Sequence, residues 1–173
     1  MSIVILIDGS NFYHKLKDLK LSDKKFSFPD FCNWISEKTF DQCTYYVGAV
    51  RQEERNRKSR KLYAKQRSFL SSLQKEGINV ELGFILKSNG VYHEKGVDVK
   101  IAVDLLVGAY ENLYDKAYLV SSDTDLIPAV EKAISLGKQI EYVGFSHAPS
   151  YALLKTCTSS RLLNRNDLEK FVF

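Results

Sequence analysis

The chain has 173 residues, of which 45% are hydrophobic and 27% charged, with a formal net charge of +4. These values are those of one globular domain over residues 1–173. The longest apolar run, Ile3–Ile7, is far too short to cross a membrane, and the N-terminal pattern leads us to expect no signal peptide. Three cysteines without a CxxC pattern favour free thiols in a reducing, cytoplasmic location.

Strand and helix patterns alternate along the chain. In chain order, we expect a strand at Ser2–Ile7, helices at Ser10–Leu19 and Phe28–Lys38, a strand at Thr44–Val50, a helix at Glu53–Lys75, a strand at Asn79–Leu86, a small hairpin return at Val91–His93, a helix at Val97–Tyr110, a strand at Lys116–Val120, a helix at Asp125–Leu136, a strand at Gln139–Val143, and helices at Pro149–Cys157 and Asn166–Phe171. This alternation predicts an α/β fold whose mostly parallel, five-stranded sheet is covered on both faces.

Positive charge is concentrated in one segment. Residues 51–67 hold eight Lys or Arg against two Glu, a local net charge of +6, whereas the rest of the chain is slightly acidic. Such a segment could bind a polyanion such as a nucleic acid, although many charged helix faces only contact solvent. Tyr63 within this segment and Tyr92 in the hairpin could stack on unpaired bases, or Tyr63 could pack inward.

Acidic residues follow two of the predicted strands directly. Asp8 ends the first strand, with Asn11 one helical turn further on, and Ser121-Ser122-Asp123 leads from the fourth strand to Asp125. Open α/β sheets bind ligands at the carboxyl ends of their strands, beside the point where strand order reverses. If these two strands are neighbours, Asp8, Asp123 and Asp125 converge in one crevice.

A third acidic segment begins the helix at Val97–Tyr110. Its first turn is expected at the same edge of the sheet, which favours Asp98 as a ligand. Asp104 lies six residues on, roughly 9 Å along the helix axis, and is better suited to a supporting or structural role.

Clustered carboxylates need a compensating cation, and the oxygen ligands favour Mg²⁺ or Mn²⁺. Such a site can activate water for phosphoryl displacement. The three histidines show no zinc-binding spacing, and the chain lacks GxGxxG, GxxxxGK[ST] and GxSxG motifs. Zinc, nucleotide-binding and serine hydrolase chemistries are therefore disfavoured.

Three motifs in this order resemble the NYN domain, specifically its LabA-like bacterial group, within the PIN-like nuclease superfamily. They are IDGSNFY (7–13), EKGVDVKIAVDLL (94–106) and LVSSDTDLIPAVEKAISLGKQIEYVG (119–144). The resemblance covers nearly the whole chain. It implies a three-layer α/β/α sandwich and a Mg²⁺- or Mn²⁺-dependent ribonuclease centre.

By position, the resemblance makes Asp8, Asp98, Asp123 and Asp125 the metal-binding, catalytic carboxylates, supported by Asn11, Ser122 and Asp104. The chain departs from the family at Ser121-Ser122, where Gly is frequent before the hydroxyl residue. It also has only Thr and Ser near 156–163, where the family's late helix often carries an Asp.

The leading hypothesis is an endoribonuclease whose basic helix binds RNA phosphates. The RNA-binding candidates are Arg51, Arg55, Arg57, Lys58, Arg60, Lys61 and Lys95. Two alternatives stay open: a catalytically weak or inactive RNA-binding or regulatory protein, and a DNA-directed nuclease. No membrane partner is expected, and the resemblance allows a homodimer.

Overall fold

The structure, a computed structural model, describes residues 1–37, 39–53 and 55–173. Its elements are β1 (Ile3–Asp8), α1 (Gly9–Asp18), α2 (Phe28–Ser36), β2 (Gln42–Gly48), α3 (Arg57–Lys75), β3 (Asn79–Ser88), β4 (Val91–Lys95), α4 (Val97–Tyr110), β5 (Lys116–Val120), the 3-10 turn η1 (Thr124–Leu126), α5 (Ile127–Ser135), β6 (Gln139–Phe145), α6 (Tyr151–Thr156), β7 (Ser159–Leu163) and α7 (Arg165–Glu169). Lys38, the predicted end of a helix, and Glu54, in the predicted basic helix, lie outside the described residues.

The seven strands form one sheet in the order β4-β3-β2-β1-β5-β6-β7. All neighbouring strands are parallel except β3 and β4, which form an antiparallel hairpin. The chain builds outward from β1 through β2 and β3, and then crosses through α4 to β5 on the other side of β1. The strand order therefore reverses between β1 and β5, where open α/β sheets bind their ligands.

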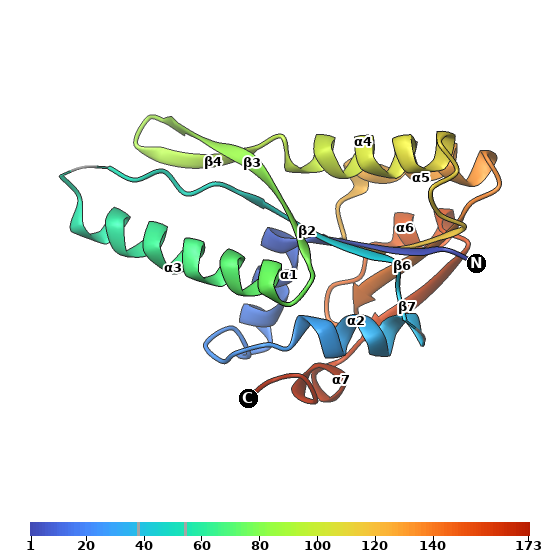
Figure 1. Ribbon diagram of the computed structural model, residues 1–173, viewed down its shortest axis with the longest axis horizontal. Helices are drawn as coiled ribbons and strands as arrows, with labels where there is room; N and C mark the ends of the chain where they lie inside the picture. The colour runs from blue at the N-terminus through green and yellow to red at the C-terminus, as the bar shows by residue number, and fades with distance from the viewer. Residues whose placement is uncertain (38, 54) are drawn as a thin grey trace.

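Helices cover both faces of the sheet, α4, α5 and α6 on one side and α1, α2, α3 and α7 on the other (Figure 1). Successive side chains of a strand point to opposite faces, so β1 contributes to both cores. Ile5 and Ile7 pack with Phe12 and Phe31 in one core, and Leu6 packs in the other. This burial on both faces explains why β1 is an uninterrupted apolar run.

The mostly parallel sheet flanked by helices is confirmed, but the predicted number of five strands is wrong. The hairpin return is a full strand, β4, and residues Ser159–Leu163 form β7 where we expected no strand. The α3 helix begins at Arg57 rather than Glu53, because the Asn56 side chain caps it by accepting the Ser59 N–H. The predicted helix at Asp125 instead begins with η1.

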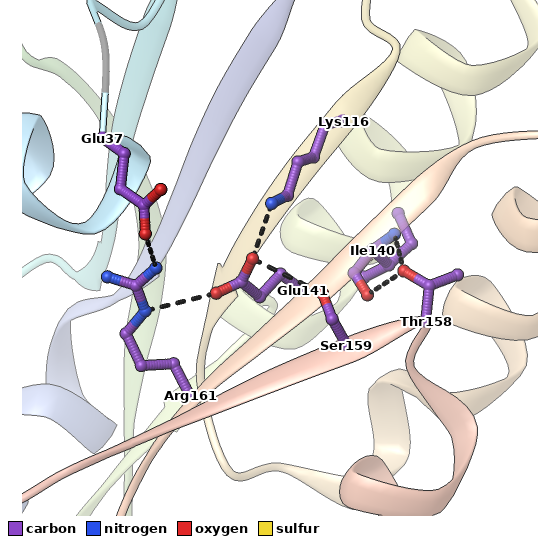
Figure 2. Close-up of polar contacts among 7 residues, drawn as sticks. All are labelled: Glu37, Lys116, Ile140, Glu141, Thr158, Ser159 and Arg161. Atoms are coloured by element: carbon purple, nitrogen blue, oxygen red, sulfur yellow. Dashed lines mark hydrogen bonds and ion pairs between the residues drawn. The ribbon is translucent and has the colours of Figure 1, made fainter.

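Contacts between side chains on different strands hold β7 at the edge of the sheet (Figure 2). The Glu141 carboxylate on β6 lies between the Lys116 Nζ, at 2.6 Å, and the Arg161 Nε, at 3.3 Å. The Thr158 hydroxyl accepts the Ile140 N–H and donates to the Ile140 carbonyl oxygen, which continues the strand pairing. These partners lie far apart in sequence, so the local pattern of SSRLL did not indicate a strand.

Candidate active site

The β1 and β5 strands end side by side, and their ends carry the candidate residues. Ile7 pairs with Val120 in the parallel register, so Asp8 and Ser121 follow at the same edge. The Ser121 side chain is fully buried, and its Oγ donates to Asp8 Oδ2 at 2.9 Å. The same Oγ accepts the Asp123 N–H at 3.1 Å. Ser121 therefore links the ends of the two strands.

Three of the predicted carboxylates come together at this edge. One oxygen from each of Asp98, Asp123 and Asp125 lies within 4.8 Å of the other two. Asp98 comes from the first turn of α4, whereas Asp123 and Asp125 follow β5. The Asp123 Oδ1 accepts the Asp125 N–H at 2.9 Å, which fixes the turn between them. We call these residues the three-carboxylate group.

Asp98 reaches the group because of how α4 begins. Gly96 is the residue before the helix and has a φ of 81°, a left-handed conformation that a residue with a Cβ rarely adopts. Partial burial raises the pKa of the Asp98 carboxyl, and the neighbouring charge of Asp123 raises it further. A cation in the group would reverse both effects by stabilising the ionised carboxylates.

Asp8 lies beside the three-carboxylate group, but among the described residues it is not one of its members. Its Oδ1 accepts the Asn11 N–H at 3.1 Å, which caps α1, and its Oδ2 is bonded to Ser121. Burial raises the pKa of Asp8 to about 6, and the charges of Glu94 and Asp98 add to this increase. Asp8 thus adds buried negative charge next to the group.

The predicted supporting residues occupy two different places. Asn11 lies at the site, where its Oδ1 accepts the Ser122 N–H at 3.3 Å. The Ser122 hydroxyl is 3.0 Å from the Tyr142 hydroxyl, so it is held toward β6. Asp104 accepts a hydrogen bond from the Tyr46 hydroxyl at 2.8 Å and, within the described chain, is outside the three-carboxylate group.

A fifth carboxylate, Glu94, was not recognised from the sequence. Its Oε2 accepts from the Ser10 hydroxyl at 2.7 Å and from the Gly48 N–H at 2.8 Å. A Cβ at position 48 would lie 2.7 Å from the Glu94 side chain, so this approach requires glycine. Glu94 belongs to the same EKGVD motif as Asp98, and this closeness in sequence was the one feature that could have indicated that Glu94 lies near the site.

The predicted RNA-binding side chains lie on exposed surface near this edge of the molecule. They are Arg51 and Arg55 before α3, Arg57, Lys58, Arg60 and Lys61 in its first turns, and Lys95 at the end of β4. Among the described residues, none of these seven forms an ion pair. Their charge is therefore available to an anion.

The donor set fits a hard divalent cation. Three carboxylate oxygens within 4.8 Å of one another can share one ion, and Mg²⁺ and Mn²⁺ prefer oxygen ligands. The group contains no His or Cys, which disfavours zinc. Without a cation, three carboxylates this close would repel one another.

In the described part of the chain, no helix is both long and apolar enough to cross a membrane.

Comparisons with known proteins give two similar solved structures and one family match. Across the fold, the chain is similar to a protein of unknown function, VPA0982 from Vibrio parahaemolyticus RIMD 2210633, with 23% identity and a TM-score of 0.72 over 99% of this chain and 96% of that one. The T5 D15 protein co-crystallised with metal ions gives 14% identity and a TM-score of 0.48 over 88% of this chain and 59% of that one. No curated protein matches the chain significantly. The NYN domain model matches residues 2–164, so the chain belongs to the NYN domain family.

Proposed function

We propose that this protein is a metal-dependent endoribonuclease. The observation that carries the proposal is the three-carboxylate group at the switch point of an NYN domain. Asp98, Asp123 and Asp125 would hold Mg²⁺ or Mn²⁺. The bound ion would activate a water molecule and stabilise the charge that develops in phosphodiester hydrolysis.

The surrounding residues keep this group in place. Ser121 and the Asn11 N–H hold Asp8, whose buried charge increases the attraction for a cation. The Asn11 side chain fixes Ser122, and therefore the turn that carries Asp123. Since these contacts join β1 to β5, the carboxylates are held by the sheet itself rather than by a free loop.

RNA is the proposed substrate because the exposed basic side chains of α3 lie at the same end of the molecule as the site. Contacts from Lys and Arg to phosphates give affinity without reading the sequence. A cytoplasmic location fits such a substrate and the three free cysteines.

Cleavage assays with the purified protein test the proposal. Labelled RNA and DNA of one sequence are incubated with Mn²⁺ or with EDTA, using wild type, Asp123→Asn and the control Asp23→Asn. Asp23 is exposed and lies in the loop after α1. We expect RNA cutting that needs Mn²⁺, falls at least about 100-fold in Asp123→Asn and persists in the control.

Two results would overturn this function. RNA binding without cutting would favour the regulatory, RNA-binding alternative, and cutting of DNA in preference to RNA would favour a DNA-directed nuclease. Equal cutting by wild type and Asp123→Asn would place the activity outside this site.

A further inference from the structure

One face of the β3–β4 hairpin exposes a row of apolar side chains. Leu82, Phe84 and Leu86 alternate along β3 and therefore share a face. Ser88 at the end of β3 lies on the same face, and Val91 on β4 pairs with Ser88, so Val91 belongs to the same row. Their exposed fractions are 44%, 53%, 42% and 56%. Contiguous exposed apolar side chains are a common feature of binding surfaces. We call it the hairpin face.

The hairpin face continues into a groove against α3. This groove has a volume of about 500 Å³, and Leu82 and Val80 line it from β3 while Tyr63 and Leu70 line it from α3. The Arg67 guanidinium lies 5.8 Å from the centre of the Tyr63 ring. The groove thus combines apolar side chains, an aromatic ring and a cation with the polar side chains of Gln66, Ser71 and Gln74.

The border of this surface is positively charged. Lys95 pairs with Phe84 across the hairpin, so it lies on the same face as the apolar row. The first turns of α3 add the exposed cations described above. An apolar surface bordered by cations that form no ion pair within the described part of the chain complements a ligand that has both flat apolar faces and negative charge.

A single nucleic-acid strand has this chemistry. Its bases offer faces for stacking and its phosphates attract Lys and Arg. A duplex hides those faces inside the base stack and offers its phosphates alone. Tyr92 is not part of this surface, because it lies with Lys87 on the opposite face and its hydroxyl donates to Glu53.

The hairpin is attached directly to the candidate active site. Glu94, adjacent to Lys95, is bonded on the other face to Ser10, in the first turn of α1, and to Gly48, at the end of β2. Asp98 begins the helix that follows. A nucleic-acid strand bound along the hairpin face would lie at the edge of the sheet that carries the three-carboxylate group, on the face opposite to Glu94.

We infer that the hairpin face and its groove bind the unpaired bases of a single-stranded RNA at the edge of the sheet that carries the three-carboxylate group. This inference rests on the proposed function, and it adds the surface that would contact the bases.

Binding is measured in EDTA, where no cleavage occurs, by fluorescence anisotropy with three labelled probes. These are a single-stranded RNA decamer, the same decamer in a duplex, and an abasic decamer that keeps the phosphates but lacks bases. The test variants are Phe84→Ser/Leu86→Ser and Leu86→Ser/Val91→Ser. The control is Val99→Ser/Val103→Ser, which changes exposed apolar residues on α4. Circular dichroism checks that each variant is folded.

We expect the single strand to bind about tenfold more tightly than the duplex or the abasic strand. Both test variants should lose about tenfold in affinity for the single strand and nothing for the abasic strand, while the control binds like wild type. Equal affinity for all three probes, or unchanged binding by both folded test variants, would overturn the inference. An acidic peptide that binds more tightly than RNA, with the same dependence on Phe84, would overturn it in favour of a protein partner.

Parallel cleavage assays in Mn²⁺ separate the two proposals. Base-dependent binding without cutting would reject the nuclease function and leave the binding surface supported. Normal cutting with an unchanged KM in both test variants would reject the binding surface and leave the nuclease supported.

Discussion

Ser121 Oγ donates to Asp8 Oδ2 at 2.9 Å, across the junction where β1 and β5 end. Both side chains are buried, at 0% and 6% exposed. This bond and the Asn11 N–H hold an acidic group that burial disfavours in its charged form. Asp8 is therefore a residue at which stability and the proposed function oppose each other.

Asp8→Asn should stabilise the metal-free protein at neutral pH. Burial raises the pKa of Asp8 from 3.8 to about 6, so the folded protein binds this proton more tightly than the unfolded chain. Stability then falls as the pH rises from about 4 to about 6, and the loss persists above that range. We expect Asp8→Asn to gain roughly 1–3 kcal/mol at pH 7.5 and to flatten this dependence. Urea denaturation in EDTA at several pH values measures the free energy of unfolding. If stability fell more steeply with pH in Asp8→Asn than in wild type, Asp8 would not be the group that causes the pH dependence.

Asp104→Ala should reduce stability without changing metal affinity. The Asp104 carboxylate accepts from the Tyr46 hydroxyl at 2.8 Å, and its removal leaves that hydroxyl without this partner. The expected cost is about 1 kcal/mol. Thermal denaturation and Mn²⁺ titration on the same sample measure the two effects, and a tenfold weaker Mn²⁺ affinity would make Asp104 a metal ligand.

RNA affinity should depend steeply on salt through the first turns of α3. Each phosphate contact to a single strand contributes a slope of about 0.7 to the decline of log affinity with log salt. Neutralising Arg57, Arg60 and Lys61 to Gln should therefore lower the slope by about 2. A charge-matched control changes Lys20, Lys24 and Lys25, which are exposed in and near the loop after α1. Equal slopes for the two triple variants would contradict a specific role of α3.

Glu141→Ala should destabilise the edge of the sheet. The change leaves Lys116 and Arg161 without their shared carboxylate, whose side chain is 8% exposed (Figure 2). We expect a loss of about 2–3 kcal/mol in urea denaturation. Glu37→Ala removes the 73%-exposed partner of Arg161 and should cost less than about 1 kcal/mol. Similar losses of stability in the two variants would show that the contacts of Glu141 with Lys116 and Arg161 contribute little to the free energy of unfolding.

Buried apolar runs made most of the fold predictable. The five expected strands all form, and the α4 helix begins and ends where its spacing indicated. The strands β4 and β7 were not predicted as part of the sheet. Nearly all of β4 is exposed, and β7 is held through Glu141 and Ile140, so neither shows a local apolar pattern. The segment at 156–163, near which the family's late helix often carries an Asp, contains this strand.

The candidate site was predictable only as far as strand ends can be located. Asp123 and Asp125 follow a recognisable strand, and the register of β1 against β5 places them beside Asp8. Glu94 was not recognised because its partners, Gly48 and Ser10, are 46 and 84 residues away in sequence. The LabA-like subgroup and the homodimer stay predictions.

Isothermal titration of the metal-free protein with Mn²⁺ tests the central claim most directly, because it does not depend on any substrate. The proteins compared are wild type, Asp98→Asn, Asp123→Asn, Asp125→Asn and the exposed control Asp23→Asn. We predict that wild type and the control bind Mn²⁺ alike and that each variant of the three-carboxylate group binds at least about tenfold more weakly. Unchanged Mn²⁺ affinity in these three variants would contradict the account.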